Sequence, residues 1–142
     1  MSAGYLFDTS FVSVLGDPGR PQHFTVRRWF NAAPTGRLYL CTIVVGEIVR
    51  GIEASPAGRK RRERERWLHQ TLLPAFPVLP FDLRCALRWG TMMGEGQRAG
   101  RTPPADDAKI AAVAVVHDLT IATLNALDFQ RLGVPYIDPT QP

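Results

Sequence analysis

Cysteine and lysine are both scarce in this chain of 142 residues. The two cysteines, Cys41 and Cys85, lie within apolar segments and show neither metal-binding spacing nor neighbouring histidines. Their number excludes a disulfide framework as the basis of the fold. We expect two buried thiols in the reducing environment of the cytoplasm.

Long hydrophobic runs are also lacking. The longest apolar stretch, Ile110–Val116, is far shorter than the roughly 20 residues that a membrane-spanning helix needs. The N-terminus has neither the basic start nor the apolar segment of a signal peptide. No repeat or linker divides the chain. We therefore expect a cytoplasmic protein without a membrane partner, folded as a single domain over residues 1–142.

Arginine, by contrast, is plentiful. The formal net charge is +4, and all 17 basic residues except Lys60 and Lys109 are arginine. The arginine fork matches phosphate and carboxylate groups geometrically. A basic domain of this kind favours a polyanionic partner, with nucleic acid first.

The apolar pattern predicts strands that alternate with helices. The expected strands cover residues 5–7, 37–43, 77–80, 119–124 and 135–137, and the expected helices cover residues 22–33, 45–52, 58–73, 82–98 and 106–117. Such alternation implies crossover connections and a mainly parallel sheet with helices on both faces. The predicted fold class is α/β.

The helix predicted over residues 58–73 contains the charged run RKRRERERWLHQ. The favoured interpretation is a solvated helix face with internal ion pairs. The alternative is a wall of a nucleic-acid groove or part of a partner interface. The three tryptophans, Trp29, Trp67 and Trp89, are expected in the core or an interface rather than as base-stacking platforms.

Four carboxylates fall at related places in this pattern. Asp8 ends the first predicted strand, and Glu47 lies in the first helical turn after the second. Asp107 opens a helix, and Asp128 follows the 119–124 strand after a short turn. The C-terminal ends of parallel strands share one edge of a sheet, so we expect these four side chains to lie close together there.

Each acid also has a purely structural interpretation. The alternatives are a helix cap for Asp8, an ion pair with Arg50 for Glu47, a cap for Asp106 or Asp107, and a turn for Asp128. Taken together, however, several half-buried carboxylates without matching bases would repel one another. A hard divalent cation such as Mg²⁺ or Mn²⁺ removes that cost, since carboxylate oxygens are its preferred ligands.

The doubled Asp106-Asp107 leaves the register of the third acid open. Asp107 shares a helical stripe with Ile110 and Ala114, so it is expected to face the core. Asp106 is offset from that stripe, lies within reach of Lys109, and is better suited to capping. We choose Asp107.

In its motifs the chain resembles the PIN-domain ribonucleases, and within them the VapC-type toxins of bacterial toxin–antitoxin pairs. The resemblance covers nearly the whole chain. It rests on the segments Asp8-Thr9-Ser10, Gly46-Glu47-Ile48 with Arg50-Gly51, Pro104-Ala105-Asp106-Asp107-Ala108 with Ile110-Ala111-Ala112, and Thr123-Leu124-Asn125-Ala126-Leu127-Asp128-Phe129. Ser10 and Leu124 depart from the family pattern, which often has Asn and Arg at these positions.

The resemblance implies a compact α/β/α sandwich that acts as a Mg²⁺- or Mn²⁺-dependent endoribonuclease. The family's metal site maps onto Asp8, Glu47 and Asp107 as main ligands, with Asp128 binding a second metal or ordering metal-bound water. The implied supporting residues are Thr9, Ser10, Thr123 and Asn125. The scattered histidines, His23, His69 and His117, disfavour a metal-free acid–base ribonuclease. Proteins of this type form homodimers and are held inactive by a small VapB-type antitoxin.

Two rival functions remain open at this stage. A haloacid-dehalogenase-like phosphatase also places an Asp after its first strand, but it needs a second Asp where this chain has Ser10. A non-catalytic RNA-binding or interaction module would use the same acids only as caps.

Overall fold

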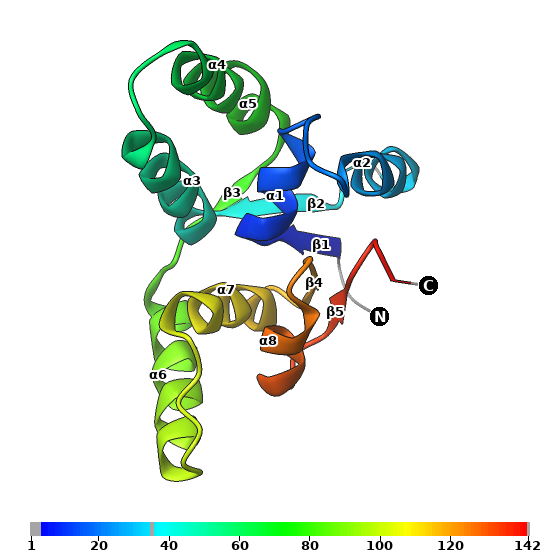
Figure 1. Ribbon diagram of the computed structural model, residues 1–142. Helices are drawn as coiled ribbons and strands as arrows, with labels where there is room; N and C mark the ends of the chain where they lie inside the picture. Colours follow the sequence, from blue (N-terminus) through cyan, green and yellow to red (C-terminus); the bar gives the residue numbers. More distant parts are fainter. Residues whose placement is uncertain (1–3, 35, 142) are drawn as a thin grey trace.

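A single parallel sheet forms the centre of the protein, whose computed structural model describes residues 4–34 and 36–141. Its strands are β1 (Gly4–Phe7), β2 (Leu38–Cys41), β3 (Val78–Leu79), β4 (Leu119–Ala122) and β5 (Tyr136–Ile137). They lie in the order β3-β2-β1-β4-β5, and every pairing is parallel (Figure 1). The predicted α/β class is confirmed.

The helices are divided between the two faces of this sheet. They are α1 (Thr9–Leu15), α2 (His23–Ala32), α3 (Thr42–Ala54), α4 (Arg59–Trp67), the π-helical turn η1 (Leu68–Leu72), α5 (Leu73–Ala75), α6 (Leu83–Arg98), α7 (Ala105–Val116) and α8 (Ala126–Arg131). In Figure 1, α6 to α8 lie toward the bottom of the view, whereas α1 lies in front of β1 and β2, and α4 and α5 lie at the top. This is the three-layer arrangement that right-handed crossovers on both sides of a parallel sheet produce.

The strand order creates a switch point in the middle of the sheet. From β1 the chain moves to β2 and β3 on one side, and it later returns to β4 and β5 on the other. Open α/β sheets bind ligands outside the carboxyl ends of the strands at such a point. Here the residues at that point are those that follow β1 and β4.

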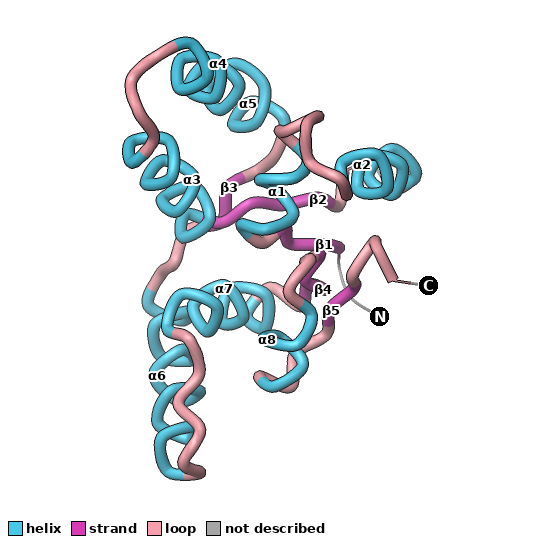
Figure 2. The backbone as a smooth tube through the Cα atoms, in the orientation of Figure 1, coloured by secondary structure: helices cyan, strands magenta, loops and turns pink. Residues whose placement is uncertain are grey.

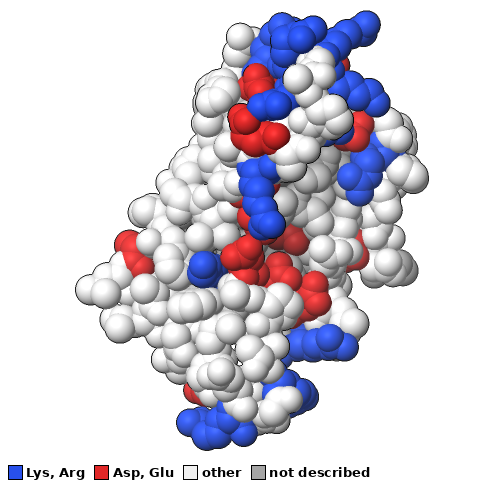
Figure 3. Space-filling view, turned by 60° about the vertical axis from the view of Figure 1, so that its left-hand side comes forward, with Lys and Arg blue, Asp and Glu red and all other residues white. Residues whose placement is uncertain are grey.

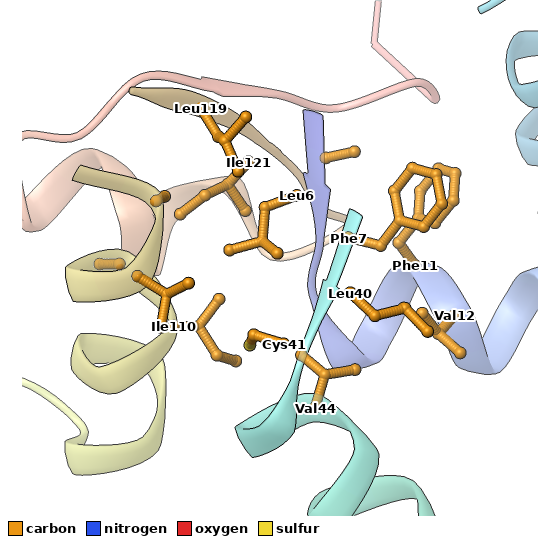
Figure 4. Close-up of a cluster of buried hydrophobic side chains, with 14 of the residues drawn as sticks. Leu6, Phe7, Phe11, Val12, Leu40, Cys41, Val44, Ile110, Leu119 and Ile121 are labelled. Atoms are coloured by element: carbon orange, nitrogen blue, oxygen red, sulfur yellow. The ribbon is translucent and has the colours of Figure 1, made fainter. Parts of the chain in front are cut away.

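The core is apolar on both faces of the sheet. Side chains of β1 alternate, so that Leu6 points toward Ile110 of α7 and Phe7 toward Phe11 of α1 (Figure 4). The rings of Phe7 and Phe11 stack with their centroids 4.5 Å apart, and Trp29 meets Phe11 edge-on. Fully or almost fully buried are Leu6, Phe7, Phe11 and Ile110. Trp29 therefore serves packing, as expected.

One boundary and one unpredicted helix differ from the sequence prediction in ways that matter for the site. The strand predicted over 37–43 ends at Cys41, and Thr42 and Ile43 begin α3. Apolar β-branched residues fit a buried strand and a buried helix start equally well, which explains the error. Glu47 consequently lies in the second turn of its helix rather than the first. The short helix α8, which carries Asp128, was not predicted.

The charged segment is a solvated helix with ion pairs. Arg59 pairs with Glu63 at 3.0 Å and Arg61 with Glu65 at 3.2 Å, and Arg61 also reaches Glu53. The favoured interpretation of this segment agrees with these contacts. Cys41 and Cys85 are buried and free, and burial raises the pKa of the Cys41 thiol to about 11. Within the described residues, none of the helices has the length and apolar character needed to cross a membrane.

Candidate active site

Asp8 is both a helix cap and a buried carboxylate. It follows β1, and its Oδ1 accepts a hydrogen bond of 2.9 Å from the backbone N–H of Phe11, which caps α1. Ser10 donates its hydroxyl to the same oxygen at 2.7 Å, and Thr123 donates to Oδ2 at 2.5 Å. Only 2% of the Asp8 surface is exposed. The capping alternative is therefore correct but incomplete, because a cap alone does not require this burial.

Backbone N–H groups that follow β4 orient the hydroxyls of Ser10 and Thr123. The backbone N–H of Leu124 donates to Ser10 Oγ at 3.0 Å, and that of Asn125 donates to Thr123 Oγ1 at 2.8 Å. Each hydroxyl thus accepts one bond and keeps its proton for Asp8. The chain thereby ties the end of β1 to the end of β4 through one carboxylate.

Opposing effects act on the pKa of the Asp8 carboxyl group. Burial raises its pKa above the ordinary value, and the hydrogen bonds from Thr123, Phe11 and Ser10 counteract that rise. The nearby charge of Glu47 raises the pKa further. Burial is the largest of these effects, so the net shift in the pKa of Asp8 is upward.

Glu47 reaches the same region from α3. Its Oε1 accepts a hydrogen bond of 2.5 Å from the hydroxyl of Thr9, the first residue of α1. No ion pair within 4 Å joins Glu47 to Arg50 among the described residues, so the proposed pairing was wrong. The contact with Thr9 holds the glutamate beside Asp8 instead of along its own helix.

Asp107 carries the clearest electrostatic signal of the site. It is half-buried in the first turn of α7, and its pKa rises to about 6. Burial is the largest cause, followed by the charges of Asp128, Asp8 and Glu47 and by a hydrogen bond with Asp128. The other three predicted carboxylates therefore lie within electrostatic range of Asp107, although the four acids come from four different helices or helix starts.

Asp106 is placed differently from its neighbour. Its Oδ1 lies 3.9 Å from Lys109 Nζ, in an exposed i,i+3 ion pair. Neither aspartate caps α7, because the cap position is occupied by Pro104 and receives no side-chain hydrogen bond. The expectation of a capping role for either aspartate was thus wrong. The placement of Asp107 favours the register chosen from the sequence.

The predicted supporting residues contribute unequally. Thr9, Ser10 and Thr123 use their side-chain hydroxyls on Glu47 or Asp8. Asn125 contributes through its backbone, since its N–H donates to Thr123 Oγ1 and its C=O accepts from the N–H of Asp128, and its side chain forms no cap for α8. The sequence signal for the hydroxyls was their position directly after β1 and β4.

The donor set suits a hard cation. No Lys, Arg or His side chain forms an ion pair with Asp8, Glu47, Asp107 or Asp128 in the described part of the chain. Figure 3 shows Asp and Glu side chains gathered in the middle of one face, with Lys and Arg side chains on both sides. Among the described residues, no three His, Cys, Asp or Glu side chains are arranged so that they could hold a metal ion together.

Comparison with known proteins gives a consistent result. The PIN domain family model matches residues 5–134. The "VapC ribonuclease Y4jK" of Sinorhizobium fredii is 33% identical over 141 residues, covering 96% of this chain and 98% of that protein. The "Toxin FitB" of Neisseria gonorrhoeae is 31% identical, covering 94% and 96%. The crystal structure of FitAcB from Neisseria gonorrhoeae superposes with a TM-score of 0.85 at 30% identity, covering 97% and 99%.

The parallel sheet carries carboxylates at its switch point, and the family model and the relatives match almost the whole chain. Together these two findings define the class of protein. The chain belongs to the PIN-domain family, and within it to the VapC-type toxins.

Proposed function

We propose that the chain is a metal-dependent endoribonuclease, the toxin of a VapBC-type pair, which hydrolyses RNA phosphodiester bonds at the acidic site. Asp8, Glu47, Asp107 and Asp128 form that site. The observation that carries the proposal is the grouping of these acids in a chain that matches the PIN domain: the charges of the other three act on Asp107 and, with burial, raise its pKa to about 6. Carboxylates at this density suit a site that receives a cation.

Mg²⁺ or Mn²⁺ is the proposed cofactor, held by Asp8, Glu47 and Asp107, with Asp128 as a further ligand or as a partner of bound water. When bound, such an ion supplies a water of lowered pKa and neutralises charge on the scissile phosphate. The fit rests on the chemistry of the donor set, which consists of carboxylate oxygens without a basic partner within 4 Å among the described residues.

The protein's own side chains prepare the site in distinct ways. Ser10, Phe11 and Thr123 fix the Asp8 carboxylate through three hydrogen bonds. Thr9 turns Glu47 toward it. Asp107 holds a proton below a pH of about 6, and that proton competes with a cation for the same oxygens.

The partners follow from the family rather than from the fold. We propose an RNA substrate, a VapB-type antitoxin as inhibitor, a homodimeric assembly and a cytoplasmic location, for a single PIN-like domain over residues 1–142. The similar protein named "Toxin FitB" supports the toxin role. The family match does not favour the haloacid-dehalogenase-like phosphatase or the non-catalytic module.

RNA cleavage by the purified chain tests the proposal. Cellular RNA incubated with the protein and Mn²⁺ should be cut into discrete fragments, which gel electrophoresis resolves. Excess EDTA should abolish cleavage, and added Mn²⁺ should restore it, because the proposed reaction depends on the ion that the carboxylates hold. Cleavage that continues unchanged in EDTA would contradict the metal-dependent function.

A further inference from the structure

A cavity of about 600 Å³ opens beside the acidic site. It lies between α6, the 99–104 loop and the start of α8, and Asp128 and Pro104 form part of its wall. Asp128 belongs both to this cavity and to the carboxylate cluster around Asp107. A chain that passes through the acidic site can therefore continue directly into the cavity.

Three arginines from three separate elements line this cavity. Arg88 comes from α6, Arg101 from the loop and Arg131 from the last turn of α8. All three residues are exposed. In the part of the chain that the structure describes, none of their guanidinium groups forms a hydrogen bond or an ion pair. Their donors are thus available for an anionic ligand.

The loop that carries Arg101 is held firmly against α6. It runs back along the helix (Figure 2), and the backbone N–H of Arg101 donates to Gly96 O at 2.8 Å. A Cβ at Gly96 would lie only 2.6 Å from Pro103 Cδ and 2.7 Å from Arg101 O. Trp89 Nε1 donates to Ala105 O at 3.1 Å where the loop enters α7. The close fit at Gly96 and this bond fix the cavity wall next to Asp107.

The rest of the lining combines three polar residues, Glu95, Thr102 and Asp128, with a larger number of apolar ones. Met92, Leu132, Pro103 and Pro104 provide hydrocarbon surface between the arginines. The volume lies within the range of about 300–1,000 Å³ that is typical of small-ligand pockets. Guanidinium groups around an apolar wall match a nucleotide, since phosphates bind the forks and an unstacked base lies on the apolar surface.

We propose that this cavity binds one unpaired nucleotide of the RNA, next to the scissile phosphate, with its flanking phosphates on Arg88, Arg101 and Arg131. The proposal rests on the ribonuclease function and adds to it the path of the strand beyond the scissile phosphate and the three arginines that hold it. A paired base cannot enter, because it remains stacked within its duplex.

Binding of a fluorescein-labelled single-stranded RNA of about 12 nucleotides, followed by anisotropy in EDTA over a range of KCl concentrations, tests this subsite. The test variant is Arg88→Gln/Arg101→Gln/Arg131→Gln. The control is Arg28→Gln/Arg62→Gln/Arg66→Gln, which removes the same charge from exposed arginines that do not line this cavity. Circular dichroism melting checks that both variants fold.

The cavity variant should bind roughly ten- to hundredfold more weakly than the parent at about 100 mM KCl, with a salt slope lower by about 1 to 2. The control variant should lose less than about threefold. With the same RNA annealed to its complement, the difference between parent and cavity variant should shrink. Equal losses in cavity and control variants, or equal losses on single strand and duplex, would overturn the subsite.

Cleavage assays separate this proposal from the function on which it rests. With Mn²⁺, the cavity variant should show a raised KM for single-stranded RNA and a kcat near that of the parent, because the four carboxylates are untouched. A parent that cleaves RNA while the cavity variant matches it in both KM and binding refutes the subsite alone. A parent that binds RNA through these arginines but never cleaves it refutes the ribonuclease function alone.

Discussion

Asp107→Asn should lower kcat/KM for RNA cleavage in Mn²⁺ by about 1,000-fold, equivalent to about 4 kcal/mol of transition-state stabilisation. Asp107 is the acid on which the charges of Asp128, Asp8 and Glu47 converge. The amide keeps the shape of the side chain but removes a charged ligand. Initial rates with a defined RNA substrate give the comparison.

Asp106→Asn is the matched control, because it makes the same chemical change one residue earlier. Asp106 pairs only with Lys109, at 3.9 Å on the surface, so its loss should change kcat/KM by no more than about threefold. The reverse result, with Asp106→Asn inactive and Asp107→Asn active, would show that the register is wrong. Removal of one like charge should leave the metal-free Asp107→Asn protein at least as stable as the parent.

Phe11→Ala should destabilise the protein by about 4 kcal/mol and lower its melting temperature by about 10 °C. Phe11 is completely buried, stacks on Phe7 and meets the edge of Trp29. Its backbone N–H also donates to Asp8 Oδ1, so the cavity left by the ring adjoins the acidic site. Thermal melting followed by circular dichroism measures the change.

Phe24→Ala provides the comparison for this substitution. Phe24 is 73% exposed on α2, and its truncation should alter stability by less than about 0.5 kcal/mol. A similar fall for both variants would mean that the aromatic cluster around Phe11 does not form the core described here.

The site residues that could best be predicted from the sequence are those that directly follow strands. Asp8, Thr9 and Ser10 come directly after a short apolar run, and Thr123 comes directly after the apolar β4 strand. In a parallel sheet these positions must share one edge. Placement at that edge was therefore predictable, and so was the α/β class.

Contacts that depend on the direction of side chains could not be predicted from the sequence. The bond from Thr9 to Glu47 joins residues 38 positions apart, and no local pattern distinguishes it from an ion pair between Glu47 and Arg50. The three arginines of the cavity come from α6, a loop and α8. Their convergence depends on how closely the loop packs against Gly96, which the sequence shows only as one glycine among twelve.

Titration of the protein with Mn²⁺ by isothermal calorimetry tests most directly whether the four carboxylates form a metal site. The parent should bind Mn²⁺ at pH 7.5, and the affinity should fall by roughly tenfold as the pH drops below about 6, because Asp107 then takes up a proton. Asp8→Asn/Asp107→Asn should abolish binding, whereas Asp106→Asn should retain it. Equal Mn²⁺ affinity in the parent and the double variant would contradict the metal site.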